Sequence, residues 1–168
     1  MTEADQLKIF HQWLSGYRAL LSKIVRAYAH NTEDMDDLFQ EITVQIWRSI
    51  PRFRYESAVS TWLYRISLNT AIRWTGSERK HRDGRTEINN EIYILKEKTK
   101  DEDDRLEWLY SEIKQMNEID KSLALLLLDG FSYREMAEIV GITETNIGVK
   151  IHRIKKHLIT RSEKFEVR

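Results

Sequence analysis

The C-terminal part of this chain is organised by residues 132–151, which read SYREMAEIVGITETNIGVKI. Ser132 and Glu135 have the spacing of a capping box, which predicts that a helix begins after Ser132. Gly141 can supply the left-handed backbone of a tight turn, and Thr143 can cap a second helix. Two short helices joined by such a turn form a helix-turn-helix, a motif that places its second helix in a DNA groove.

The second helix of this motif has an apolar face and a polar face. The apolar positions recur on one helical side, at Ile147, Ile151, Ile154 and Leu158. The opposite face carries side chains suited to base edges and phosphates: Thr145, Asn146, Lys150, Arg153, Lys156 and His157. We therefore predict a duplex-binding surface, with a helical hairpin whose basic face is merely solvated as the alternative. Gly148 is unusual here, because glycine costs about 1 kcal/mol relative to alanine inside a helix. Either it admits a phosphate or another helix, or the helix is weaker than its pattern implies.

Helical periodicity also dominates the N-terminal part. An apolar stripe predicts one long amphipathic helix over residues 10–28. A second helix is expected from the Asn31 cap to Pro51, and a third over residues 62–74, ending near 75–77. The N-terminal domain is thus predicted to hold three helices.

Between these parts, residues 77–104 lose the periodicity and end in the acidic run KDEDD. The chain is therefore predicted to be all-α, with two small helical domains joined by a flexible acidic linker. The expected boundaries are 1–82, 83–104 and 105–168, with the helix-turn-helix in the last segment. Within the linker, Ile92–Leu95 form an apolar island that could be a short strand, a short helix or an anchor on a partner.

Cations, aromatic rings and an amide alternate through the loop and helix that follow Pro51. The residues are Arg52, Phe53, Arg54, Tyr55, Arg65, Asn69 and Arg73. Such a mixture suits single-stranded nucleic acid, because rings stack on unpaired bases while guanidinium groups hold phosphates. Trp62 and Trp74 lie nearby on the apolar stripe, and their spacing favours a place in the core.

The preceding helix carries a different polar face, with Asp37, Gln40, Glu41 and Arg48. A largely acidic, amide-bearing face repels DNA, so a protein partner is the better interpretation. A merely solvated surface is the alternative.

Composition narrows the function classes further. The 27 Lys and Arg balance the 27 Asp and Glu, but residues 43–82 hold 8 basic against 2 acidic groups and residues 146–168 hold 7 against 2. Two basic blocks separated by an acidic middle suggest two nucleic-acid surfaces, although solvated helix faces would give the same count. The chain has no cysteine, which excludes disulfides, thiolate catalysis and cysteine-ligated zinc. No phosphate-binding loop, nucleophile elbow or metal-ligand spacing is present, so we expect no enzyme, metal or cofactor. The longest apolar run, 123–128, is far too short to span a membrane, and we expect a cytoplasmic protein without membrane insertion.

These motifs, taken in order, resemble a known family. Asp37-Leu38-Phe39-Gln40-Glu41 is followed by Ile46-Trp47-Arg48, then by Thr61-Trp62-Leu63-Tyr64-Arg65-Ile66 with Asn69, and finally by the helix-turn-helix. The chain resembles the extracytoplasmic-function sigma factors of bacterial RNA polymerase over roughly residues 10–160. The order of several motifs makes this resemblance more specific than any one of them.

The resemblance implies a role for each surface. The Asp37, Gln40, Glu41 and Arg48 surface would dock on the clamp of the largest polymerase subunit. The segment from Arg52 to Trp74 would open and read the minus-10 element, its 52–60 loop holding a flipped base. Residues 105–160 would read the minus-35 duplex and sit on the flap of the second-largest subunit, and the acidic linker would thread the active-site and RNA-exit channels.

The resemblance also implies binding partners, and some residues of the chain depart from the family pattern. A protein of this family would be a monomer when free, would bind promoter DNA with the polymerase core, and would commonly be held inactive by an anti-sigma factor. Ile147 and Gly148 depart from the polar residues expected in the recognition helix. Lys and Arg are sparse in 105–145, so flap docking would use apolar residues such as Leu125–Leu128, or acidic ones. The alternative is a helix-turn-helix repressor or activator that binds duplex DNA as a dimer, which leaves the cation and aromatic cluster unexplained.

Overall fold

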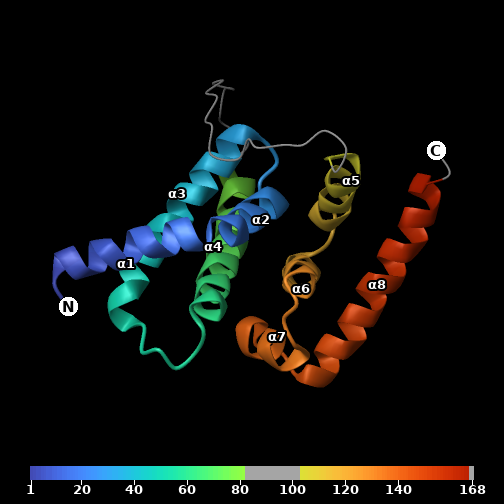
Figure 1. Cartoon of the computed structure of the whole chain (residues 1–168). Coiled ribbons are helices and arrows are strands. Elements are labelled where there is room, and N and C mark those ends of the chain that lie inside the picture. Colours follow the sequence, from blue (N-terminus) through green and yellow to red (C-terminus); the bar gives the residue numbers. More distant parts are fainter. Residues whose placement is uncertain (82–102, 167–168) are drawn as a thin grey trace. The chain divides into compact units, whose positions relative to one another are not determined.

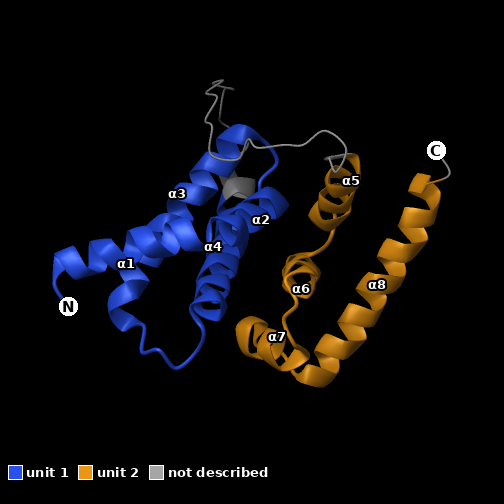
Figure 2. Cartoon of the chain, in the orientation of Figure 1, with its two compact units in different colours: residues 1–99 blue, residues 100–168 orange. Residues whose placement is uncertain are grey.

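The computed structural model describes residues 1–81 and 103–166. The chain divides into two compact units, an N-terminal unit of residues 1–99 and a C-terminal unit of residues 100–168 (Figure 2). All regular elements of the described residues are helices (Figure 1). The predicted all-α class is therefore confirmed. Within the described ranges, no helix is long and apolar enough to cross a membrane.

The N-terminal unit contains α1 (Glu3–Gly16), α2 (Arg18–Tyr28), α3 (Thr32–Ser49), the short 3-10 helix η1 (Ile50–Arg52) and α4 (Val59–His81). Helices α2, α3 and α4 pack on one another. Their shared core includes Leu21, Ile24, Leu38, Ile42 and Leu63, all fully buried. The apolar residues are spaced three or four apart along each helix, so folding places them on one side and buries them together.

The predicted helix over residues 10–28 is wrong, because the chain breaks at Tyr17. This residue has φ −116° and ψ 22°, outside the helical range, and it follows Gly16, a poor helix former. The break lets α1 and α2 bury different faces. Trp13 of α1 is buried against the ring of Phe53, and Gln6 donates from Nε2 to the carbonyl oxygen of Trp47 at 2.8 Å. The described part of this unit therefore has four α-helices rather than three.

The predicted end of the third helix near 75–77 is also wrong, since α4 continues to His81. Glycine ends a helix when it adopts a left-handed backbone, and Gly76 does not have a positive φ. A Cβ placed on Gly76 would meet nothing within 4 Å, so its small size does not serve a close contact. Here the glycine is simply an exposed residue inside a continuing helix.

The C-terminal unit contains α5 (Asp103–Lys114), α6 (Glu118–Leu128), α7 (Tyr133–Val140) and α8 (Glu144–Glu166). Its core is formed by Leu123, Leu125, Leu126, Ile147 and Ile151, each fully buried. Asn117 caps α6 by accepting a hydrogen bond from the backbone N–H of Asp120 at 2.9 Å. The expected linker, with the apolar island Ile92–Leu95, lies almost entirely outside the described residues.

Candidate nucleic-acid interface

The loop between η1 and α4 displays aromatic rings on a buried support. The Phe53 ring is largely buried and lies 5.3 Å, between centroids, from both Trp13 and Trp62. On its other side the Tyr55 ring lies 4.6 Å away and is 73% exposed. Phe53 therefore packs among neighbouring rings and has little exposed surface, whereas Tyr55 presents an accessible ring.

The backbone of Tyr55 is strained. Its φ of 59° lies in the left-handed region, where no other non-glycine residue of the described chain is found. A bulky aromatic residue pays a steric cost in this region, and such strain persists only where surrounding packing holds it. Arg52 and Arg54 precede Tyr55 in the chain and are both exposed. The segment thus combines an accessible aromatic ring with two exposed cations.

Helix α4 continues this surface. Asn69 and Arg73 are exposed and Arg65 is half-buried, and their spacing of four residues places them along one side of the helix. The Arg73 Nε donates to the carbonyl oxygen of Asn69 at 3.3 Å. The predicted cation and amide residues of α4 therefore do share one face.

The two tryptophans of α4 are half-buried, so they meet only in part the expectation that they lie in the core. The indole N–H of Trp62 donates to Oγ of the buried Ser49 at 3.2 Å, which ties α4 to the end of α3. The indole nitrogen of Trp74 is buried with no hydrogen-bond partner among the described residues. It lies at a shallow depression between α3 and α4 that Glu41, Gln45 and Arg73 also line.

Helix α3 presents the predicted protein-binding residues. Gln40, Glu41 and Arg48 are exposed, and Asp37 is half-buried with interactions of its own. Val44 lies between them and is 43% exposed. Nothing in the sequence distinguishes this apolar residue from others in the helix, so it was not predicted to belong to the surface. The pKa of the neighbouring Asp36 carboxyl is raised by burial. The surface therefore combines charge with an apolar spot, as protein interfaces often do.

The helix-turn-helix has the predicted local geometry. Ser132 accepts a hydrogen bond from the Glu135 backbone N–H at 3.2 Å, and the Glu135 carboxylate accepts one from the Ser132 N–H at 2.7 Å. Gly141 has φ 82°, and Thr143 accepts a hydrogen bond from the N–H of Asn146 at 3.2 Å. The capping box, the left-handed turn and the second cap are all confirmed.

A residue of the neighbouring helix lies beside Gly148. A Cβ placed on this glycine would lie 3.7 Å from Cε2 of Tyr133, the first residue of α7. The phenol ring therefore lies beside the backbone of α8 at this point. A Cβ would make an ordinary contact at this distance, so the neighbouring helix does not require glycine, and a helix weakened by its glycine remains the interpretation that agrees with the structure.

The polar residues of α8 divide into two groups. Thr145, Asn146 and Lys156 are exposed to solvent. Lys150 is turned toward α6, where its Nζ lies 3.9 Å from Oδ1 of Asp120. His157 is turned toward α5, with its Nε2 3.6 Å from Oε2 of Glu112. The predicted DNA face is therefore partly engaged with the C-terminal unit itself.

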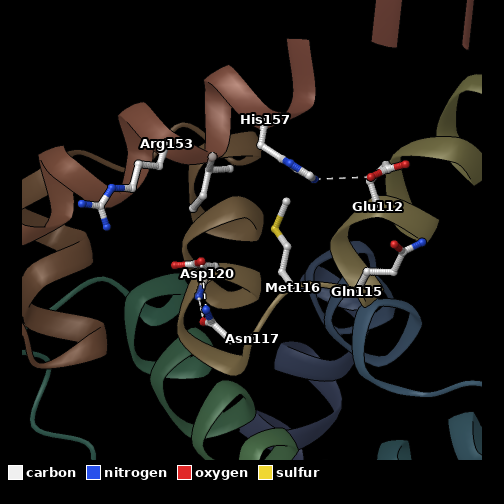
Figure 3. A pocket seen from close by; sticks show the side chains of 8 residues that line it. Glu112, Gln115, Met116, Asn117, Asp120, Arg153 and His157 are labelled. Atoms are coloured by element: carbon white, nitrogen blue, oxygen red, sulfur yellow. Dashed lines mark hydrogen bonds and ion pairs between the residues drawn. The ribbon is translucent and has the colours of Figure 1, made fainter. Parts of the chain in front are cut away.

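Figure 3 shows the pocket where these contacts meet, between α8 and the α5–α6 turn. His157 reaches toward Glu112, whereas Arg153 extends away from that pair. Arg161 donates from Nε and Nη2 to the same Glu112 carboxylate at 3.0 to 3.3 Å. This carboxylate holds the distal part of α8 on α5 and leaves Arg153 exposed for other partners.

Two exposed residues of α8 were missed from the sequence. Val149 is 47% exposed, and His152 is exposed beyond it. Val149 lies nearly opposite the buried Ile147 and Ile151, and His152 lies beside Val149 on the exposed side, so a helical wheel centred on those isoleucines would have found them.

The apolar flap-docking residues expected from the sequence are mostly unavailable. Leu125 and Leu126 are fully buried in the core, Leu127 is half-buried, and Leu128 alone of the four is well exposed, at 51%. A run of consecutive leucines covers every side of a helix, and α6 packs against both α7 and α8, so most of the run is consumed by the core.

Comparison with known proteins identifies two family regions. Sigma-70 region 2 matches residues 14–81, and Sigma-70, region 4 matches residues 106–158. The ECF RNA polymerase sigma-E factor of Haemophilus influenzae is 28% identical over 166 residues, covering 89% of this chain and 85% of that protein. The RNA polymerase sigma factor YlaC of Bacillus subtilis is 27% identical over 147 residues, covering 84% of each.

Two solved structures share the fold. CnrH, in complex with the cytosolic domain of CnrY, superposes with a TM-score of 0.67 at 18% identity and covers 94% of this chain and 90% of that chain. The sigma factor RpoE of Bartonella quintana, in complex with the anti-sigma factor NepR, gives a TM-score of 0.65 at 22% identity. That match covers 90% of this chain and 94% of that chain.

Proposed function

The chain belongs to the sigma-70 family, as a sigma factor of the extracytoplasmic-function type, and we propose how its two units divide the work of promoter recognition. It directs core RNA polymerase to specific promoters and helps to open the minus-10 DNA for initiation. The observation that carries the division is that region 2 and region 4 lie on separate compact units, in that order.

The N-terminal unit binds the minus-10 element as an unwound strand. Supporting this assignment, Tyr55 is exposed in the same loop as the exposed Arg52 and Arg54, while Asn69 and Arg73 extend along one side of α4. Rings stack on unpaired bases and guanidinium groups hold phosphates, so this surface suits a single strand better than a duplex. In this proposal Phe53 acts indirectly, by supporting Tyr55, and Arg65 contributes from its half-buried position.

The α3 surface binds the polymerase core. It consists of Asp37, Gln40, Glu41 and Arg48 around the exposed Val44. Acidic groups disfavour DNA, and the family assignment supports the clamp of the largest subunit as the partner. Because α3 and α4 pack together, this surface and the strand-binding surface belong to one compact unit.

The C-terminal unit binds the minus-35 duplex through the N-terminal half of α8. Thr145 and Asn146 are exposed at the start of the helix, and Arg153 and Lys156 follow. Such helices contact base edges through their first turns and phosphates from their flanks. Lys150 and His157 can join only by sharing their bonds with Asp120 and Glu112.

The remaining features of the proposal concern partners and activity. Both structural relatives were solved with a binding partner, and the partner NepR is an anti-sigma factor, which supports an anti-sigma factor for this chain as well. The family assignment further supports docking on the flap, a free monomer, a cytoplasmic location and no catalytic activity of its own. The family matches favour this reading over a dimeric repressor.

A crossed pair of variants tests the division within the N-terminal unit. Asn69→Ala combined with Arg73→Ala should slow promoter opening by about tenfold or more, since two polar contacts to the strand are lost, and should leave core affinity unchanged. Gln40→Ala combined with Glu41→Ala should weaken core binding instead. Opening is measured with a fluorescent base analogue in the minus-10 strand, at saturating holoenzyme, and core affinity by titration.

The two double variants control for each other, because all four side chains are exposed and none supports the core. If both variants lose core affinity equally, the assignment of separate surfaces is incorrect.

A further inference from the structure

At the start of helix α8, fewer side chains face the solvent than the polar sequence suggests. Ile147, Ile151 and Ile154 are buried and define the inner side. At about 100° per residue, Val149 lies roughly 200° from Ile147 and therefore points outward. With 47% of its surface exposed, Val149 is at the centre of the outer face, between Thr145 and Arg153.

The two residues next to Val149 in the sequence are engaged with the rest of the C-terminal unit. Lys150 is directed to Asp120 of α6, at 3.9 Å. On the other side, Gly148 has no side chain and its backbone lies beside the Tyr133 ring. In the second turn of the helix, Val149 is therefore the side chain that a ligand approaching from outside meets first.

The fold gains little from valine at this position. A β-branched residue is a poorer helix former than alanine, because its rotamers are restricted against the preceding turn. Glycine immediately before it is poorer still, and a valine that is 47% exposed offsets only part of this cost by burial. Residues that disfavour the local structure and bring no packing benefit occur mainly at functional sites.

The chemistry of valine restricts what it can recognise in DNA. Its side chain has no hydrogen-bond donor or acceptor, so it cannot form hydrogen bonds with the edges of the bases. In the major groove the apolar group of an unmodified base pair is the C5-methyl of thymine. We propose that Val149 contacts the C5-methyl group of a thymine in the minus-35 element and is a specificity-determining residue of this sigma factor. The proposal rests on the assignment of α8 to the upstream duplex.

The test removes one methyl group at a time from the DNA. A promoter is first obtained by run-off transcription of genomic fragments with the holoenzyme. Each thymine of its upstream element is then replaced by deoxyuridine, which retains the base pair and lacks only the methyl. For the unaltered holoenzyme we expect one position at which the substitution weakens promoter binding by about fourfold, the factor that corresponds to burying one methyl-sized group.

The protein side of the test is Val149→Ala. We expect this variant to bind the thymine promoter more weakly and to have lost the response to deoxyuridine at that same position. Ile159→Ala is the matched control, because Ile159 is a 60% exposed apolar residue farther along the same helix. Its holoenzyme should respond to deoxyuridine as the unaltered one does. Alanine is the better helix former, so the Val149 variant should retain its fold, which circular dichroism verifies.

The outcomes separate this inference from the function on which it rests. If scrambling the whole upstream element leaves binding unchanged, the assignment of α8 to that duplex fails. If scrambling abolishes binding but no single deoxyuridine weakens it, or the Val149→Ala holoenzyme responds as before, the assignment stands and the role of Val149 is overturned. An upstream element without thymine would overturn it equally.

Discussion

Glu112 is a charged residue in the interior of the C-terminal unit. Its side chain is 4% exposed and is shared by Arg161 and His157, whose side chains are 44% and 55% exposed. A buried carboxylate is tolerated only where such partners satisfy its oxygens. These contacts join residues nearly fifty positions apart and hold the distal part of α8 on α5.

Removing this carboxylate should weaken the C-terminal unit. We expect Glu112→Ala to lower the free energy of unfolding by about 1–3 kcal/mol, because the hydrogen bonds and the side-chain packing are lost while the side chains of Arg161 and His157 can still reach water. Urea unfolding measures the change. Glu138→Ala on α7, where the side chain is 57% exposed, should change stability by less than about 0.5 kcal/mol. Equal losses in the two variants would show that the Glu112 contacts have no special weight.

Asp5 offers a test of the first helix cap. Hydrogen bonds from the Thr2 side chain and backbone lower the pKa of the Asp5 carboxyl. Because the folded-state pKa is lowered, the hydrogen bonds to the Asp5 carboxylate stabilise the folded chain at pH values above the pKa that Asp5 has in the unfolded chain. This stabilisation is lost as the pH falls through the folded-state pKa. An NMR titration should place the Asp5 pKa below its ordinary value, and Thr2→Ala should move it upward. An unchanged pKa in that variant would mean that the capping box does not form.

At the scale of elements, the features predicted correctly from sequence were those determined within a few residues. Ser132 with Glu135, Gly141 and Thr143 each act on a neighbouring backbone group, so their spacing is sufficient evidence. The break at Tyr17 was missed because the apolar stripe continues through it, and the divergence of α1 depends on Phe53, far along the chain. The orientation of Lys150 was missed for the same reason, since its partner Asp120 lies on another helix.

Helix α8 should become more stable when Gly148 is replaced. The space beside this glycine accepts a Cβ at an ordinary contact distance of 3.7 Å from Tyr133, and its φ is not positive. Gly148→Ala should therefore raise the free energy of unfolding by about 0.5–1 kcal/mol, through helix propensity alone. Urea unfolding of the full chain checks this. A loss of stability would mean that the Tyr133 ring cannot adjust and that glycine is required for packing.

At the scale of the whole molecule, the two DNA-binding units belong to one chain, so initiation should depend on the spacing between the two promoter elements. Two weak contacts become selective when both elements are engaged at once, because the second binding event is then intramolecular. Inserting about five base pairs between the elements rotates one of them by roughly half a turn of the duplex. We expect this insertion to reduce initiation by at least tenfold. With an insertion of about ten base pairs, initiation should remain impaired because the spacing between the elements is longer. Full activity after the shorter insertion would contradict simultaneous engagement.

The central claim is that this chain gives promoter specificity to core RNA polymerase. The most direct measurement is run-off transcription from fragmented genomic DNA with core polymerase, with and without the protein. The account predicts new transcripts whose start sites share two sequence motifs at a constant spacing. If no new transcripts arise, and the protein alone binds duplex DNA as a dimer, the claim is contradicted and a repressor or activator takes its place.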